Sequence, residues 1–574
     1  MRLADKFCVL KMLTLAASLN ALATLSCQAA SVSNDINKPN IVLIVADDLG
    51  YSDLGAFGSE IATPHLDALA ESGVQLTNFH AAPTCSPTRS MLLTGTDNHI
   101  AGVGTMAETI LPEQKGKAGY EGYLTDRVVT FPTLLRESGY HTFMAGKWHL
   151  GKTPELSPAA RGFERSFALL DGSAHHFTQG GVTPMRPKAT YRQDGKEIDL
   201  PKNFKYSTDF YTDQLISDIA TRKDNKPFFG YLAYTAPHWP LQVPEAYLQR
   251  YKGVYDKGYK AIADARLQRL KDKGIIAKDV VSNPGPGLWP VWEDLSATER
   301  ALEIRRMEIY AAMVTNMDDN VGKLVTYLKD TGEYDNTIFV FLSDNGAEGS
   351  GPEDITPVNP KWIRENFDNS LGNIGKQGSF ASYGPQWALV SSTPFRMYKT
   401  STYEGGIRTP AFISGPGMRN GEISDTYVSV KDIAPTFLEV ASAKQPADIN
   451  PNAAKIEGTS ALGFLRNSQK SVHNPDDVQC TELFGRVALF KGQWKLAFSN
   501  KPWGTGEFEL FDMQRDPSEI NDLSDEQPQV KTELLEQWST CQKRNGILWN
   551  PQLADKLHYG NEVKKYQTAK DASQ

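Results

Sequence analysis

A cysteine and an arginine lie four residues apart in the segment CSPTRSMLLTG, which runs from Cys85 to Gly95. Pro87 is favoured in the first turn of a helix, the apolar residues after it continue the helix, and Gly95 can end it. Cys85 is therefore predicted near a helix N-terminus, with Arg89 on the same helix face. A thiol-derived group and a fixed cation would then face one volume, and an anion would be stabilised there.

Four other segments each combine a buried apolar run with polar residues at its end. These residues are Asp47 and Asp48 (NIVLIVADDLG), Asp344 and Asn345 (NTIFVFLSDNG), His238 (PFFGYLAYTAPHWP), and Lys147 and His149 (YHTFMAGKWHLG). Continuous apolar runs rich in β-branched residues are typical of strands buried on both faces. In open parallel sheets the ligand site lies beyond the carboxyl ends of the strands, so we expect these polar residues to meet there.

Helical patterns between the strands indicate the fold class. They occur at residues 63–73, 130–139 and 296–332. The alternation of strands and helices predicts an α/β fold with a large mixed, mostly parallel sheet sandwiched by helices, over residues 38–450.

The pattern changes in the last part of the chain. A hairpin is predicted around Lys491 and Gly492, a further strand in EFELFDM, and an amphipathic helix over residues 527–544. We therefore expect residues 451–574 to form a smaller C-terminal α+β domain that contains an antiparallel sheet.

The oxygen donors at the ends of the first two runs could hold a metal ion. Carboxylates and an amide suit a hard divalent cation and favour calcium over magnesium. The alternative is that each pair caps a helix or starts a turn, but two such pairs at two strand ends favour the metal. Asp318 and Asp319 differ, because they lie within a helical pattern and are predicted to be structural.

The amino-acid composition is typical of a globular protein. It has 574 residues, of which 40% are hydrophobic and 22% charged, with a formal net charge of −8. The negative charge and the lack of a basic stripe argue against a nucleic-acid partner.

The N-terminus resembles an export signal. Arg2 and Lys6 flank an apolar run that ends in the small residues SCQAAS, so residues 1–29 are predicted to be a signal peptide cleaved after Ala29. A lipoprotein anchored at Cys27 is the alternative, but the residues before Cys27 match that motif poorly. No later run approaches the ~20 apolar residues of a membrane span. We therefore expect a periplasmic or secreted protein.

The opening motif resembles the signature of a known family. CSPTRSMLLTG is similar to the sulfatase pattern Cys-x-Pro-x-Arg followed by Thr-Gly, and GKWHLG, APHWP and SDNG resemble its companion motifs. The resemblance runs from PNIVLIVADDLG to ELFDMQRDPSEINDL. It identifies the chain as a member of the formylglycine-dependent sulfatases of the alkaline phosphatase-like superfamily, closest to soluble bacterial arylsulfatases.

The resemblance implies hydrolysis of sulfate monoesters, namely aryl sulfates and small alkyl sulfates. It implies that a formylglycine-generating maturation system converts Cys85 to 3-oxoalanine, whose hydrate is the nucleophile. One calcium ion per chain would be held by Asp47, Asp48, the modified Cys85, Asp344 and Asn345. The other implied roles are Arg89 bridging the hydrate and the metal environment, Lys147 and Lys399 contacting sulfate oxygens, His149 taking a proton as sulfate leaves, and His238 protonating the departing alcohol.

Several alternatives remain open from the residues alone. Lys399 without the resemblance would be a surface lysine, and a lone histidine such as His238 is more often structural. The same fold could hydrolyse phosphonate monoesters or phosphodiesters, and a sulfate-ester binding protein would keep Cys85 as a thiol.

Smaller expectations concern the surroundings of the site and the assembly. His175 and His176 could line the substrate mouth, and Trp387 could form an aromatic wall, although tryptophan is more often core. Cys480 and Cys541 could pair as a disulfide, and we expect a monomer.

Overall fold

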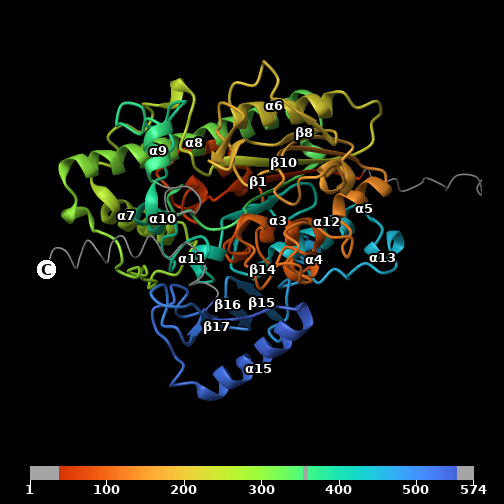
Figure 1. Ribbon diagram of the computed structural model, residues 1–574. Helices are drawn as coiled ribbons and strands as arrows, with labels where there is room; N and C mark the ends of the chain where they lie inside the picture. The colour runs from red at the N-terminus through yellow and green to blue at the C-terminus, as the bar shows by residue number, and fades with distance from the viewer. Residues whose placement is uncertain (1–37, 353–359, 553–574) are drawn as a thin grey trace, which may run out of the picture. The chain divides into compact units, whose positions relative to one another are not determined.

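A ten-stranded mixed sheet lies at the centre of the computed structural model, which describes residues 38–352 and 360–552 (Figure 1). Its strands, in spatial order, are β13 (Glu422–Ser424), β2 (Val74–Leu76), β12 (Ala411–Ser414), β11 (Thr337–Ser343), β1 (Asn40–Asp47), β10 (Phe228–Pro237), β4 (His141–Lys147), β5 (Arg165–Leu169), β8 (Tyr191–Gln193) and β9 (Lys196–Ile198). The five neighbours from β11 to β5 are parallel, and antiparallel pairs flank them. The predicted α/β fold class is confirmed.

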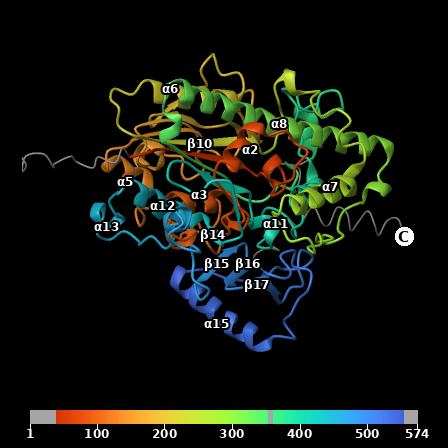
Figure 2. The ribbon, with the colours of Figure 1, turned by 180° about the vertical axis from the view of Figure 1, so that it is seen from behind.

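Helices cover both faces of this sheet (Figures 1 and 2). Successive residues of a strand face opposite sides, and Val42 and Ile44 belong to one hydrophobic core while Ile41 and Leu43 belong to the other. The first core includes residues of α2 (Pro64–Glu71), α6 (Ser207–Ala220), α7 (Gly258–Asp272), α8 (Ala297–Asp330) and α10 (Gly384–Ser391). The second includes residues of α3 (Cys85–Thr94), α5 (Phe131–Glu137), α12 (Ile433–Val440) and α14 (Leu462–Leu465).

The predicted helices at residues 63–73, 130–139 and 296–332 are confirmed as α2, α5 and α8. Apart from α15 (Pro528–Asn545), the remaining described α-helices are α4 (Asn98–Ala101), α9 (Pro360–Asn366), α11 (Glu404–Ile407) and α13 (Pro446–Ile449). Two small two-stranded sheets pair β3 (Phe79–His80) with β14 (Val428–Ser429), and β6 (Gly180–Thr183) with β7 (Arg186–Lys188).

The four apolar runs with polar ends are neighbouring strands. β11, β1, β10 and β4 lie side by side in parallel, so their carboxyl ends reach the same edge of the sheet. At that edge the Asp344 amide donates to the Ala46 carbonyl at 3.1 Å. The topology therefore brings the polar residues after each strand to one place.

A four-stranded antiparallel sheet forms from the last part of the described chain: β15 (Val478–Leu483), β16 (Arg486–Lys491), β17 (Trp494–Phe498) and β18 (Phe508–Asp512). α15 (Pro528–Asn545) packs against it. The hairpin, the strand and the helix expected here are confirmed. β15 was not expected, because the sequence VQCTEL alternates polar and apolar residues too weakly to stand out.

A disulfide joins Cys480 in β15 to Cys541 in α15, with their Cα atoms 6.8 Å apart. This is the pairing that the cysteine positions allowed. The expected domain boundary near residue 450 stays a prediction.

The signal peptide expected at residues 1–29 lies outside the described residues. Within the described part of the chain, no helix combines the length and the apolar character that a membrane crossing needs.

Candidate active site

Cys85 is the first residue of α3, as the sequence predicted. Thr84 precedes the helix with extended backbone, and Gly95 follows it in the left-handed conformation, with φ 66°. The Cys85 side chain is buried at 2% exposure, and its Sγ lies 3.4 Å from Asp47 Oδ1 and 3.7 Å from Asp48 Oδ1. The helix N-terminus therefore places the thiol against the end of β1.

Asp47, Asp48, Cys85 and Asp344 form a buried cluster whose ligand atoms all lie within 4.8 Å of one another. Asn345 joins it, because its Nδ2 donates to Asp48 Oδ1 at 2.6 Å. Asp48 adopts a left-handed backbone with φ 68°, a conformation that aspartate tolerates better than most residues. The predicted ligands are thus brought together at the edge of the sheet.

The donor set fits a hard divalent cation. Asn345 Oδ1 is buried without a hydrogen-bond partner among the described residues, although buried amide oxygens are nearly always satisfied. Burial and the neighbouring carboxylates raise the pKa of Asp47 to about 7, while Lys147 opposes that rise. An oxygen-binding cation would satisfy the amide oxygen and offset the crowded negative charge.

Asp48 behaves differently from Asp47. Burial alone would raise the pKa of Asp48, but Lys399 and His238 outweigh burial and hold it below its usual value. Each of the two adjacent carboxylates is paired with a lysine, Asp47 with Lys147 and Asp48 with Lys399, but burial and the neighbouring carboxylates prevail only at Asp47.

Arg89 connects four of the elements that build the site. Its side chain is fully buried, and its Nε and Nη2 lie 2.9 and 2.7 Å from Asp344 Oδ2. Nη1 donates to the Lys147 carbonyl at 2.9 Å, and Nη2 lies 3.8 Å from Asp47 Oδ1. Arg89 thus ties α3 to the ends of β11, β4 and β1.

Two buried lysines reach the cluster from different segments. Lys147 Nζ donates to both carboxylate oxygens of Asp47, at 2.7 and 2.8 Å. Lys399 Nζ lies 2.8 Å from Asp48 Oδ2 and 2.9 Å from Glu348 Oε2. At 4% exposure Lys399 is not a surface lysine.

Glu348 was missed by the sequence reasoning. It lies four residues after Asp344, and that spacing in SDNGAEG was its only signal. Burial raises the pKa of Glu348, while Lys399 acts against that rise.

His238 lies beside Asp48, with its Nε2 3.3 Å from Asp48 Oδ2. Its Nδ1 lies 2.6 Å from the Trp239 carbonyl and 3.3 Å from Ser173 Oγ. Burial lowers the pKa of His238 well below the usual value, although Asp48 opposes this. Both ring nitrogens face oxygen acceptors, so a protonated ring would satisfy both.

His149 contacts a residue that the sequence reasoning did not consider. Its Nε2 lies 3.2 Å from Glu108 Oε2, and its Nδ1 is buried without a hydrogen-bond partner among the described residues. Burial lowers the pKa of His149, and Glu108 opposes this. His149 has a left-handed backbone, with φ 56°, so the chain leaves the direction of β4 at this residue.

The expected aromatic wall at Trp387 is wrong. Trp387 is fully buried, packs against Tyr255 and Tyr259, and donates to the Glu303 carbonyl at 3.0 Å. Its ring belongs to the hydrophobic core and cannot contact a substrate.

A cavity of about 380 Å³ has His175, Gln242 and Phe367 in its wall, and His238 does not line it. Ring contacts lead to it from His238 through Trp239 (4.7 Å) and Phe380 (5.8 Å) to Phe367 (4.6 Å). His176 is buried beside it, with Nε2 3.2 Å from the His238 carbonyl. Of the two histidines, His175 lines this cavity.

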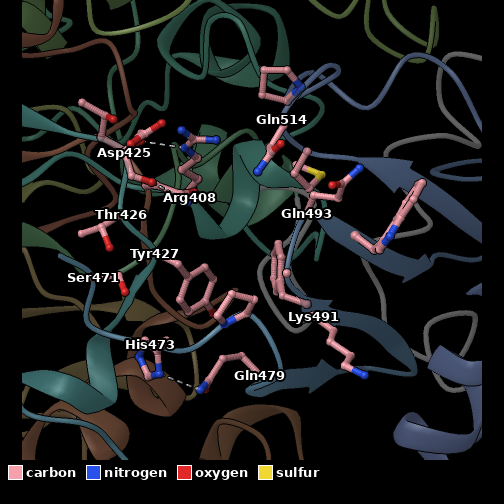
Figure 3. A pocket seen from close by; sticks show the side chains of 18 of the residues that line it. Arg408, Asp425, Thr426, Tyr427, Ser471, His473, Gln479, Lys491, Gln493 and Gln514 are labelled. Carbon is pink, nitrogen blue, oxygen red and sulfur yellow. Dashed lines mark hydrogen bonds between the residues drawn. The ribbon is translucent and has the colours of Figure 1, made fainter.

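A larger cavity of about 1060 Å³ lies elsewhere, between the edge of the large sheet and the C-terminal sheet (Figure 3). Tyr427, Lys491 and Gln493 line it, and a hydrogen bond joins Gln479 to His473 in its wall. None of the predicted site residues lines this cavity.

Asp318 and Asp319 are structural, as predicted. Asp318 accepts hydrogen bonds from the backbone amides of His65 and Leu66, the first turn of α2, at 3.2 and 2.7 Å. Asp319 accepts from the Tyr247 hydroxyl at 2.8 Å.

Comparison with known proteins finds family models and relatives that match most of this chain. The family model described as Sulfatase matches residues 39–443, and the one described as N-sulphoglucosamine sulphohydrolase, C-terminal, matches residues 395–544. An uncharacterised sulfatase of Schizosaccharomyces pombe is 44% identical over 535 residues, covering 90% of this chain and 95% of that relative.

Two further relatives extend the comparison. An arylsulfatase of Klebsiella aerogenes is 43% identical over 424 residues, covering 72% of this chain and 88% of that relative. The solved structure titled Ps i-CgsB in complex with k-i-k-neocarrahexaose matches with a TM-score of 0.63 and 26% identity, covering 92% of this chain and 98% of that chain.

Proposed function

Because this chain belongs to the sulfatase family and is a sulfate-ester hydrolase, we propose that its substrates are aryl sulfates and small alkyl sulfates. The observation that carries this proposal is the position of Cys85 Sγ, 3.4 Å from Asp47 in a buried site that also holds Arg89, Lys147 and Lys399. Cationic side chains held around Cys85 suit a sulfate ester, because its negative charge increases on the departing oxygen as the sulfur–oxygen bond breaks.

We propose that Cys85 acts after conversion to 3-oxoalanine by a maturation system of the producing cell. Burial, reinforced by Asp344, raises the pKa of the Cys85 thiol well above its usual value, so the unmodified side chain is a poor nucleophile. The hydrate of the aldehyde would supply one hydroxyl that displaces the alcohol from sulfur and a second through which sulfate is then expelled. An unmodified thiol has no hydroxyl to play either part, so the site would lack its nucleophile without the conversion.

The cation is proposed to be calcium. Asp47, Asp48, Asp344 and the Oδ1 of Asn345 would hold it, and an oxygen-only set after conversion of Cys85 favours calcium over softer metals. When bound, the ion would polarise a sulfate oxygen.

The remaining residues have proposed roles that their contacts support. Arg89 fixes Asp344 and orients the helix that carries Cys85. Lys147 and Lys399 offer ammonium groups to sulfate oxygens at the same edge of the sheet. Both can donate hydrogen bonds that strengthen as negative charge develops on the sulfate.

The two histidines are proposed to move protons. Glu108 holds His149 Nε2, which leaves the unpartnered Nδ1 to accept a proton as sulfate leaves. His238 Nε2, beside Asp48, is placed to donate a proton to the departing alcohol. The cavity lined by His175 and Phe367, which the rings of Trp239 and Phe380 connect to His238, is the proposed site for the outer part of an aryl group.

We also propose an exported protein, periplasmic or secreted, that acts as a monomer. The disulfide between Cys480 and Cys541 supports an oxidising compartment.

Three experiments test the proposal. A peptide mass spectrum of the active protein should show 3-oxoalanine at position 85, and Cys85→Ala should abolish turnover while the circular dichroism spectrum stays unchanged. Rates on nitrophenyl sulfate should exceed those on a matched nitrophenyl phosphodiester and on a nitrophenyl phosphonate monoester. Faster hydrolysis of either phosphorus ester would favour the alternative activity, and an active protein with an unmodified thiol would overturn the role of Cys85.

A further inference from the structure

Glu348 is a buried carboxylate to which the proposed mechanism gives no role. It is 4% exposed, and its Oε1 accepts a hydrogen bond from the Ser350 amide at 2.8 Å. Its Oε2 lies 2.9 Å from Lys399 Nζ. Glu348, Asp48 and His238 offer atoms that lie within 4.8 Å of one another. Glu348 is therefore beside both the cation assigned to sulfate and the histidine assigned to the departing alcohol.

The charges of the site nearly cancel. Its buried carboxylates are Asp47, Asp48, Asp344 and Glu348, and its buried cations are Arg89, Lys147 and Lys399. The three cations balance three of the four carboxylates, so a divalent ion would leave one positive charge for the substrate, to which a protonated His238 would add a second. Without Glu348 the net charge of the site would be higher by one unit in either protonation state of His238.

A sulfate monoester carries one negative charge, whereas a phosphate monoester at mildly alkaline pH carries close to two. The two groups have similar tetrahedral shapes, so contacts alone discriminate poorly between them. A fixed negative charge repels the dianion about twice as strongly as the monoanion. Specificity of this kind comes from a repulsive element and not from a new attractive one.

We propose that Glu348 is a specificity-determining residue that makes the site select monoanionic sulfate monoesters over dianionic phosphate monoesters. The inference rests on the proposed function, because it concerns the same site. One unit charge acting across a few ångströms in a partly buried site changes a binding or rate ratio by about tenfold or more.

The first test compares kcat/KM for nitrophenyl phosphate and nitrophenyl sulfate at mildly alkaline pH. Glu348→Gln should raise the phosphate-to-sulfate ratio by about tenfold relative to wild type, and Glu348→Asp, which keeps the charge, should keep a ratio near wild type. Glu308→Gln is the matched control. Glu308 is also buried, lies 3.2 Å from Arg305 and accepts from the Gly253 amide at 3.1 Å, but it is not part of the site.

The second test measures binding without turnover, by calorimetry on the mature protein. Benzylphosphonate and benzylsulfonate have the same frame and differ in charge. Glu348→Gln should shift the ratio of their Kd values toward benzylphosphonate by a similar factor, and Glu308→Gln should not. If Glu348→Gln does not fold, both tests are repeated with Glu348→Met, which removes the charge and has a side chain of similar volume to glutamate.

The outcomes separate this inference from the proposed function. Unchanged ratios in a folded charge-removing variant, with wild type active on sulfate esters, would overturn the role of Glu348 alone. A wild-type protein that hydrolyses no sulfate ester would count against the proposed function, whatever the ratios of the binding experiment.

Discussion

Arg89 and Asp344 form a buried ion pair in which two guanidinium nitrogens, at 2.9 and 2.7 Å, reach the same carboxylate oxygen. The pair joins the helix that begins at Cys85 to the end of β11, two segments that are about 250 residues apart in the chain. Geometry at Cys85 therefore depends on a contact that local sequence does not contain.

The first prediction follows from this pair. Arg89→Ala should lower the free energy of unfolding by about 3–5 kcal/mol, because it leaves Asp344 buried without its partner. Arg89→Lys keeps the charge but cannot hold Asp344 and the Lys147 carbonyl together, so it should stay folded and lose most activity. Urea unfolding and kcat/KM measure the two effects.

Arg127→Ala is the control for that experiment. Arg127 pairs with Glu121 at 2.7 Å but is 41% exposed, so its removal should change stability by less than about 1 kcal/mol and leave activity intact. Equal losses in the Arg89 and Arg127 variants would remove the special role of the Arg89 contact.

The second prediction concerns the metal. Chelation should abolish activity, calcium should restore it, and calcium should raise the Tm of the chelated wild-type protein because it binds the folded state. Asp344→Asn should lose the rise in Tm, since it weakens a ligand of the cluster. Asp318→Asn, a change in an equally buried aspartate outside the cluster, should keep it. Metal analysis that finds zinc in the active protein would contradict the calcium assignment.

The third prediction tests His238 as the acid toward the alcohol. A general acid typically raises the reaction rate by ~10²–10⁴-fold, and its effect is largest for poor leaving groups. His238→Ala should therefore cost near the top of that range for alkyl sulfates and much less for nitrophenyl sulfate. Equal losses in kcat/KM across a leaving-group series would leave His238 with a binding or structural role.

The fourth prediction concerns pH and stability. His99 is buried between Asp97 (3.0 Å) and Glu482 (3.1 Å). Burial alone would lower the pKa of His99, but the two carboxylates outweigh burial and raise it to about 9. A histidine whose pKa is higher in the folded than in the unfolded chain stabilises the folded state. This contribution is complete when the pH is below the unfolded pKa of 6.5, and it is lost as the pH rises through the folded pKa of about 9.

Unfolding free energies measured across this pH window test the prediction. The wild-type protein should lose roughly 2–3 kcal/mol from this group between neutral pH and the upper end of the window. His99→Gln should remove that pH dependence. A variant that keeps the full wild-type slope would show that other groups cause it.

The sequence could predict the cluster because each of its parts has a local signal. Asp47 and Asp344 follow apolar runs long enough to be buried strands, and parallel strands must end at one edge. The start of α3 at Cys85 is marked by Pro87 and Gly95. Local periodicity and topology rules together were enough to place these residues.

Residues that lack such a pattern were not predictable. Glu348 lies in an irregular segment and Glu108 in a 3-10 helix of only three residues, Ala107–Thr109, and each reaches the site through a long-range contact, with Lys399 or with His149. The burial of Trp387 depends on Tyr259 of α7 and on Tyr255 just before that helix, and a tryptophan in a sequence does not reveal which side of its helix will be covered. Tertiary contacts decide such cases.

The burial of Cys85 restricts when it can be modified. In the folded chain the side chain is 2% exposed, under Asp47 and Asp48, and α3 packs against α12 (Ile433–Val440). If Cys85 is converted as proposed, a maturation enzyme could not reach a group in that position, so it would have to act while the N-terminal part of the chain is still open. The segment that encloses Cys85 is made more than 300 residues after it, and synthesis at about 5–20 residues per second leaves an interval on the order of 15–60 seconds before closure. Protein that folds before modification would keep its thiol permanently, and the active fraction of a preparation would be set during translation.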